Sequence, residues 1–180
     1  MLPDSPAPEA DDFTKTDEVA EAPREVDDIL EMVSLVELSD VYVWEERGRR
    51  IDETATEEDR EPRIRQVLNV GDRDDFLGVA FRFRMSVDDR QGNEFIADYQ
   101  ARYELAAPAQ FTSEVRAEFA ERVAFFTVYP YLRASIQMTA SRMGAPAPVL
   151  AIVRAGEFKL GTTMTDEAVA TEFRDTVPEA

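Results

Sequence analysis

Two stretches of alternating apolar and polar residues, joined by a short turn, constrain this chain more than any other feature. From 77 to 88 every second residue is apolar, and from 95 to 105 aromatic or aliphatic side chains again take every second position. Side chains alternate between the two faces of a β-strand, so this period predicts two strands, each with one buried face. Between them, DDRQGN offers Gly92 and Asn93, which tolerate positive φ. The sequence therefore predicts an antiparallel β-hairpin.

Two further strands are expected before the hairpin. Residues Ile29 to Glu46 are dense in Val, Leu and aromatic side chains, which favours one long strand. Its alternation slips between Val33 and Val36, where we expect a bulge. A polar, turn-rich loop from Arg47 to Glu61 follows. Apolar residues then alternate again from Ile64 to Val70, which predicts a shorter strand.

The second half of the chain is predicted to be helical. After Pro108 the spacing of apolar residues changes from two to between three and four, as on one face of a helix. Thr112 or Ser113 could cap the first helix. We expect two successive helices, broken or sharply bent near Thr127 to Pro130, because proline inside a helix removes a hydrogen bond. Four strands followed by two helices predict an α+β fold: a four-stranded antiparallel sheet with two helices packed on one face.

The two ends of the chain set the expected domain limits. Residues 1–25 are rich in Pro, Ala, Asp and Glu, and offer too little apolar surface to offset the entropy of ordering. We expect a disordered acidic tail there, one folded domain over 26–160, and a C-terminal tail over 161–180 with at most a weak helix between Asp166 and Arg174.

Composition excludes several classes of function. Cysteine and histidine are absent, which removes disulfides, thiolate or imidazole metal sites and histidine-based triads. Neither a P-loop nor a GxGxxG fingerprint occurs, so no nucleotide cofactor is expected. A net charge of -18 opposes binding to nucleic acid or to anionic membranes. With no apolar run typical of a signal peptide or membrane span, we expect a cytoplasmic protein without membrane insertion.

The start of the predicted second helix carries an aromatic-Pro-Tyr-x-Arg motif. It consists of Tyr129, Pro130, Tyr131, Leu132 and Arg133. The helix leads into a Gly and Pro stretch and then a short apolar run, in the sequence VYPYLRASIQMTASRMGAPAPVL. Together with the order of strands and helices, residues Ile29 to Phe158 resemble the SecB family of protein-export chaperones. The resemblance implies a homotetramer, a dimer of dimers, that holds unfolded preproteins in surface grooves and passes them to the SecA motor.

A chaperone of this kind needs exposed apolar surface that tolerates varied client sequences, and it needs no ATP to hold clients passively. Aromatic and aliphatic side chains near the motif, on the first strand and beyond the apolar run could supply it. The candidate client-binding residues are Tyr42, Trp44, Tyr131, Phe158 and Leu160. The alternative for the first three is that they are ordinary core residues, since large aromatic side chains are mostly buried.

The resemblance also implies partner contacts on the exposed face of the sheet. In export members of the family, acidic residues there receive a basic, zinc-bearing tail of the SecA motor. The matching positions in this chain are Asp40, Glu45 and Asp98. Positions where family members make contacts between dimers are matched by Ile96, Ala97 and Asp98.

Two alternatives stay open at this point. Some relatives of the family protect an aggregation-prone antitoxin of a toxin–antitoxin system instead of export clients, and the sequence does not separate the two roles. The second alternative is an α+β enzyme or small-ligand-binding domain with an unrecognised site. A closed, drug-sized pocket lined by converging polar groups would favour that reading, whereas open apolar grooves would favour a chaperone, which is not an enzyme.

Overall fold

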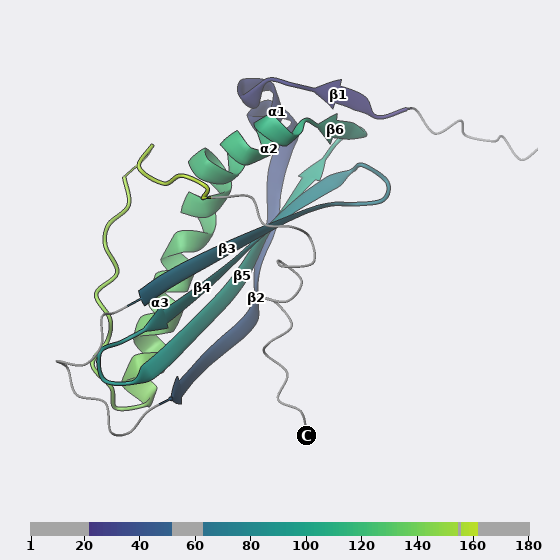
Figure 1. Cartoon of the computed structure of the whole chain (residues 1–180). Helices are drawn as coiled ribbons and strands as arrows, with labels where there is room; N and C mark the ends of the chain where they lie inside the picture. Colours follow the sequence, from purple (N-terminus) through teal and green to yellow (C-terminus); the bar gives the residue numbers. More distant parts are fainter. Residues whose placement is uncertain (1–21, 52–62, 155, 162–180) are drawn as a thin grey trace, which may run out of the picture.

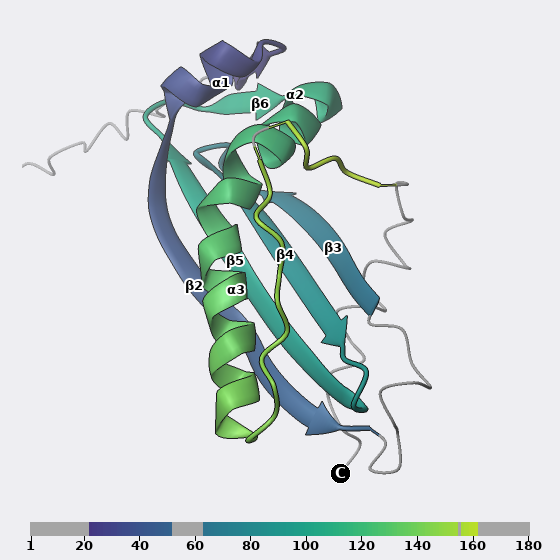
Figure 2. The same ribbon diagram turned by 90° about the vertical axis from the view of Figure 1, so that its left-hand side faces the viewer.

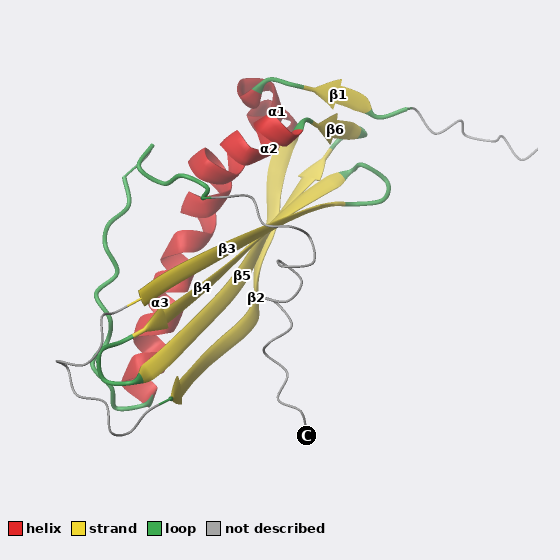
Figure 3. Ribbon diagram, in the orientation of Figure 1, coloured by secondary structure: helices red, strands yellow, loops and turns green. Residues whose placement is uncertain are grey.

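The computed structural model describes residues 22–51, 63–154 and 156–161. The weak helix expected between 166 and 174, and most of the predicted acidic tail, lie outside the described residues. Four long strands form one antiparallel sheet in the order β2-β5-β4-β3. Their bounds are β2(Val36–Arg50), β3(Arg63–Asp72), β4(Gly78–Asp88) and β5(Asn93–Leu105). Helices lie on one side of this sheet, which confirms the predicted fold class (Figures 1 and 3).

The predicted hairpin is formed by β4 and β5. Phe83 pairs with Tyr99, and the register continues without a break from Gly78 to Asp88. In the turn, the Asp89 carboxylate accepts hydrogen bonds from the backbone of Gln91 at 2.8 Å and of Asn93 at 2.8 Å. Gly92 takes φ 76°, a conformation that glycine adopts without strain.

The helical half of the chain consists of the two predicted helices, joined by a π-helical turn. It runs from α2(Ser113–Phe119) through a π-helical turn (Ala120–Ala124) into α3(Phe125–Arg142). The predicted break near Thr127 to Pro130 is wrong, because Pro130 lies inside α3. Val128, Tyr129 and Leu132 pack against the core around the proline. That burial offsets a proline cost of about 3 kcal/mol.

Thr112 caps α2, as predicted: its hydroxyl accepts from the Val115 N–H at 3.3 Å.

Figure 2 shows α3 lying along the sheet over β5 and β2. We call the face that α3 covers the inner face and the opposite one the outer face. The inner face carries the core, which includes Phe81, Phe95, Phe119 and Phe125.

The single long strand predicted for Ile29 to Glu46 is wrong in its first part. Residues Ile29 to Leu35 form helix α1, and β2 begins only at Val36. The Asp28 side chain caps α1 by accepting from the Glu31 N–H at 2.9 Å. The bulge expected between Val33 and Val36 is therefore absent from that described segment, and the register of β2 shifts instead between 38 and 40 and between 43 and 45.

A second, small sheet closes the top of the molecule in Figure 1. It pairs β1(Arg24–Val26) with β6(Ala109–Phe111) in parallel, and neither strand was predicted. Val26 and Phe111 are buried. Residues 24 and 25, expected in the tail, are thus part of the folded structure.

The chain after α3 turns back along the helix without regular secondary structure (Figure 2). We call its described part, 145–154 and 156–161, the strap. Gly144, with φ 65°, ends the helix as predicted. Leu150 is buried, and Phe158 stacks on Phe125 with ring centroids 3.7 Å apart. The strap therefore completes the core beside α3.

Candidate functional site

A chain of alternating ion pairs crosses the outer face of the sheet. At its centre is Asp98 on β5, whose side chain is completely buried. Its carboxylate accepts from Arg82 at 2.8 and 2.7 Å and from Arg84 at 3.1 Å. Arg84 also donates to Glu45 at 2.7 Å. The chain of contacts then continues along β2 and β5 through Glu45, Arg47, Glu94 and Arg49.

The three acids predicted to dock a basic partner differ in their availability. Asp98 has both carboxylate oxygens engaged by arginines inside the protomer. Glu45 is paired with Arg84 and Arg47. Asp40, opposite Arg102 in the register, is the exposed member of the three. The docking role of these acids stays a prediction, and Asp40 is the one with an open carboxylate.

The first two predicted client-binding aromatics lie together on the outer face. The rings of Tyr42 and Trp44 are 5.4 Å apart, and the Gln100 side-chain oxygen accepts from both, at 3.3 and 2.7 Å. Arg102 stacks over Tyr42 and Arg82 over Trp44, with the guanidinium carbon 4.1 and 4.2 Å from the ring centroid. Trp44 is 51% exposed. These aromatics are surface residues, fixed by neighbours on β4 and β5.

The residues predicted to contact another dimer have little exposed side chain. Ile96, Ala97 and Asp98 are all buried in the protomer. Alternation along β5 puts Ala97 on the inner face and the other two on the outer face, as the sequence indicated. Their role in assembly stays a prediction.

An apolar strip lies where α3 meets the edge strand β2. Tyr131 and Met138 are seven residues apart, so they share one side of α3. Tyr131 lies beside Tyr99, at 5.9 Å between ring centroids, and Val43 pairs with Tyr99 in the sheet. Four side chains here are about half exposed. We call them the edge strip: Leu38, Val43, Tyr131 and Met138.

A polar contact joins β5 to β2 beneath the edge strip. The Tyr99 hydroxyl donates to the Glu46 carboxylate at 2.5 Å. Burial, and then this hydrogen bond, raise the pKa of Tyr99 to about 12. The hydrogen bond from Tyr99 lowers the pKa of Glu46. Glu46 therefore stays ionised and holds the tyrosine hydroxyl in place.

The last two predicted client-binding residues lie on the strap. Phe158 fits between Phe125 and Phe83, whose centroids are 3.7 and 6.5 Å from its own. The backbone N–H of Leu160 donates to Glu121 at 2.8 Å, and the neighbouring Lys159 reaches the same carboxylate at 2.7 Å. Phe158 and Leu160 are partly buried against the core. The five predicted residues thus occupy three separate places.

The strap and β3 also expose apolar side chains that the sequence analysis did not single out. Val149 is 94% exposed and Ile152 is 79% exposed, while Leu150 between them is buried. Ile64, on the inner face of β3, is 52% exposed. Nothing in their spacing distinguishes them from core residues. Val149 and Ile152 lie outside the core because of the path of the strap, whose apolar residues follow neither the helical nor the strand period.

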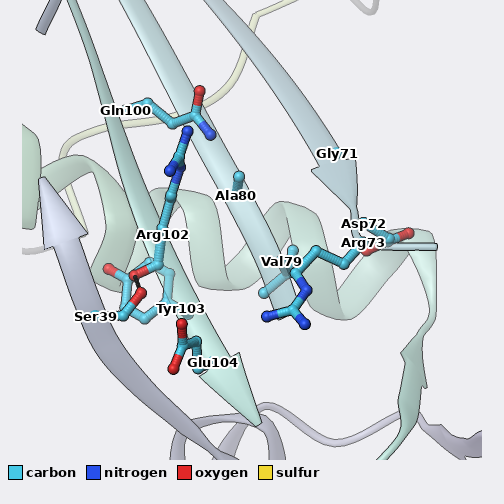
Figure 4. Close-up of a pocket in the computed structure, with 10 residues that line it drawn as sticks. All are labelled: Ser39, Gly71, Asp72, Arg73, Val79, Ala80, Gln100, Arg102, Tyr103 and Glu104. Carbon is cyan, nitrogen blue, oxygen red and sulfur yellow. Dashed lines mark hydrogen bonds between the residues drawn. The ribbon is translucent and has the colours of Figure 1, made fainter. Parts of the chain in front are cut away.

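A hollow of about 450 Å³ opens on the outer face near the end of β3 (Figure 4). It exists because Gly71 and Ala80 put almost no side chain there. Two of the charged residues at its rim pair with residues outside it: Asp72 with Arg116 at 2.6 Å, and Arg73 with Asp75 at 2.5 Å.

In the part of the chain that the structure describes, no helix is long and apolar enough to cross a membrane. Within the same residues, no cluster of three or more acidic side chains is arranged to hold a metal ion.

The inner side of the sheet exposes apolar side chains, whereas the charged groups of the outer face pair with one another. Contiguous exposed apolar surface marks sites of interaction with other proteins. The chain is 34% identical over 139 residues to the SecB-like chaperone SmegB of Mycolicibacterium smegmatis, covering 77% of this chain and 89% of that one. The chain belongs to the SecB-like chaperones. No family model matches it.

A solved structure shares the fold. It is the SecB-like chaperone of Mycobacterium tuberculosis in complex with a ChAD peptide from the HigA1 antitoxin. The TM-score is 0.58 at 13% identity, and the match covers 70% of this chain and 96% of that one.

Proposed function

We propose that this protein is an ATP-independent holdase that binds unfolded polypeptides in the cytoplasm. The observation that carries the proposal is the exposure of Val149 and Ile152 on the strap, in a chain that belongs to the SecB-like chaperones. Removing apolar area from water is favourable by roughly 25 cal/mol per Å² and needs no energy source. Aliphatic side chains on an irregular segment suit clients of varied sequence.

We place the client surface on the inner side, around the strap and β3. Ile64 on β3 is also exposed on this side of the sheet. Trp44 on the outer face is less suited, because Arg82 and Gln100 already occupy its ring face and its N–H. Clients would therefore bind at the strap rather than at the aromatic pair on the outer face.

An antitoxin-type client is the better candidate than an export preprotein. Delivery for export requires the SecA motor to be received, and the acids expected to receive its basic tail are Asp40, Glu45 and Asp98. Of these, Asp98 and Glu45 already neutralise Arg82 and Arg84 inside the protomer. A buried ion pair offers little charge to an outside partner. The relative bound to an antitoxin peptide supports the same choice.

The holdase proposal can be tested by aggregation of a chemically unfolded substrate, followed by light scattering without ATP. Wild type should suppress aggregation at a near-stoichiometric ratio. Ile152→Ser should weaken the protection several-fold, because it removes exposed apolar area. Trp44→Ser removes an exposed apolar side chain from the opposite face and serves as the matched control. Absence of protection by wild type would refute the holdase, and equal loss in both variants would refute the inner-side surface.

The choice of client can be tested by calorimetry with two peptides. The first is the ChAD peptide of the HigA1 antitoxin, and the second is the basic, zinc-bearing tail of a SecA motor. We expect binding of the first and none of the second at low salt. Binding of the tail that Asp40→Lys abolishes would restore the export role, since it would identify a working acidic docking site.

A further inference from the structure

The second half of the strap, Gly156–Gly161, is packed into the fold in an unusual way. We call this segment the latch. Across the described residues, no backbone–backbone hydrogen bond joins the latch to the sheet or to α3. It is held by the packing of Phe158 and Leu160 against the core and by one carboxylate, that of Glu121. A segment without ladder hydrogen bonds opens more easily than a strand or helix.

The slot that holds the latch is built from the rigid part of the fold. Phe83 on β4 and Phe125 at the start of α3 are both buried, and the Phe158 ring lies parallel to that of Phe125, with an interplanar angle of 2°. Phe158 itself is only partly buried. The Phe158 ring therefore comes from an irregular segment and occupies a slot whose walls belong to regular secondary structure. A side chain of a bound ligand would occupy the slot in the same way.

The polar contacts of the latch repeat the pattern of peptide recognition. Glu121 receives a backbone N–H from Leu160 and the ammonium of Lys159, at 2.8 and 2.7 Å. These two donors are ones that any extended chain with a basic residue can supply. The latch is therefore held by chemistry that does not depend on its being covalently part of this protein.

The two halves of the strap differ in how firmly they are held. In the first half, Leu150 is buried and the Tyr129 hydroxyl donates to the Ala151 carbonyl. The latch begins at Gly156, which has φ 87°. Rotation about a glycine backbone is less restricted than at other residues. The latch can thus leave while the first half of the strap stays on α3.

We propose that the latch is an internal stand-in for a client, and that an unfolded segment displaces it to place an apolar side chain in the slot between Phe83 and Phe125. This inference rests on the proposed holdase function. A client then competes with the latch, so its apparent affinity is reduced by the fraction of molecules in which the slot is occupied. Phe158 and Lys159 consequently oppose client binding rather than contribute to it.

The test compares the affinity of full-length variants for one probe, reduced and carbamidomethylated pancreatic trypsin inhibitor, an unfolded basic chain. Phe158→Ser should bind the probe roughly threefold or more tightly than wild type, because the slot is emptied. Lys159→Ala, which leaves the core intact, should bind about twofold more tightly. Arg154→Ala is the matched control: it removes the same charge from the strap at a side chain that is 82% exposed, and its ion pair with Glu157, at 3.9 Å between exposed groups, contributes little to stability. It should not bind more tightly than wild type.

Hydrogen exchange gives a second readout on wild type. The Leu160 amide, bonded to Glu121 in the free protein, should exchange faster when the probe is bound. Weaker or equal binding by Phe158→Ser would overturn the inference, as would slower exchange at Leu160. If Phe158→Ser does not fold, Lys159→Ala against Arg154→Ala decides. A wild type that fails to bind the probe would refute the holdase function itself, and the stand-in with it.

Discussion

The guanidinium of Arg82 meets the carboxylate of Asp98 at two points across strands β4 and β5, with Nε to Oδ1 at 2.8 Å and Nη2 to Oδ2 at 2.7 Å. Arg84 shares the second oxygen, at 3.1 Å. Because the Asp98 side chain is completely buried, its charge is compensated by these arginines and not by water. The exposed side of the sheet is thus organised around one buried anion.

Replacing Asp98 by Asn should therefore destabilise the protein strongly. The change leaves two guanidinium groups without their shared anion, and breaking a buried pair in this way typically costs about 3 kcal/mol. Urea unfolding of Asp98→Asn and wild type measures the loss. Asp40→Asn, an exposed acid two strand positions from Tyr42, is the control and should change the free energy of unfolding by less than about 0.5 kcal/mol. Equal, small effects in both variants would show that Asp98 is hydrated.

The sequence predicted the face on which Asp98 lies but not its burial. Alternation along β5 is a local property, and it correctly separates Asp98 from Ala97 and Tyr99. The burial comes from Arg82, Arg84 and Glu45, which reach Asp98 from neighbouring strands. Strand order and register decide those contacts, and neither follows from one strand's own pattern.

The sequence carried a helix-start signal for α1, but strand propensity outweighed it. Val33, Leu35 and Val36 favour a strand by propensity, and this preference led to the wrong prediction. Asp28 followed three residues later by Glu31 is the pattern of a capping box, which marks a helix start.

The edge strip could be predicted in part from the sequence, because Tyr131 and Met138 are two helical turns apart. The path of the strap was not, because it follows from tertiary packing alone.

Gly48 should tolerate no side chain. It lies on β2 under the end of α3, and a Cβ built there would come within 2.3 Å of the Met143 sulfur and 2.6 Å of the Thr139 methyl. Overpacking of this kind costs about 1–3 kcal/mol, so Gly48→Ala should lower the free energy of unfolding by that amount in urea. Gly71→Ala, with nothing within 4 Å of its Cβ, should be close to neutral. Adding Met143→Ala should rescue part of the loss, and no rescue would contradict the contact.

The Tyr99 hydroxyl should make stability depend on alkaline pH. Burial, and then the bond to Glu46, raise its pKa from 10.0 to about 12, so the folded state holds this proton more tightly than the unfolded state does. That contribution is complete below pH 10 and is lost as the pH rises from about 10 to about 12. Wild type should exceed Tyr99→Phe in thermal stability at pH 8, and the difference should shrink by pH 11. A difference that stays constant over this range would contradict the assignment.

The edge strip should mediate assembly with a second copy of the chain. Strand β2 is 15 residues long and lies at the sheet edge, where its backbone can pair with another chain. The edge strip adds exposed apolar area along the same edge, so a second copy is the partner that the geometry favours there. The resemblance to SecB implies a dimer of dimers, and light scattering should give about four times the 20.4 kDa of one chain.

Met138→Lys should dissociate this assembly, because it places a charge in an interface that excludes water. Ile64 offers the matched control, since it is exposed to the same extent, 52%, but lies on β3 at the opposite edge of the sheet. Ile64→Lys should keep the assembly mass of wild type while weakening client binding. Met138→Lys should lower the assembly mass. A wild type that scatters as a 20.4 kDa monomer at micromolar concentration would refute the assembly. Dissociation by Ile64→Lys alone would instead move the interface to the β3 edge.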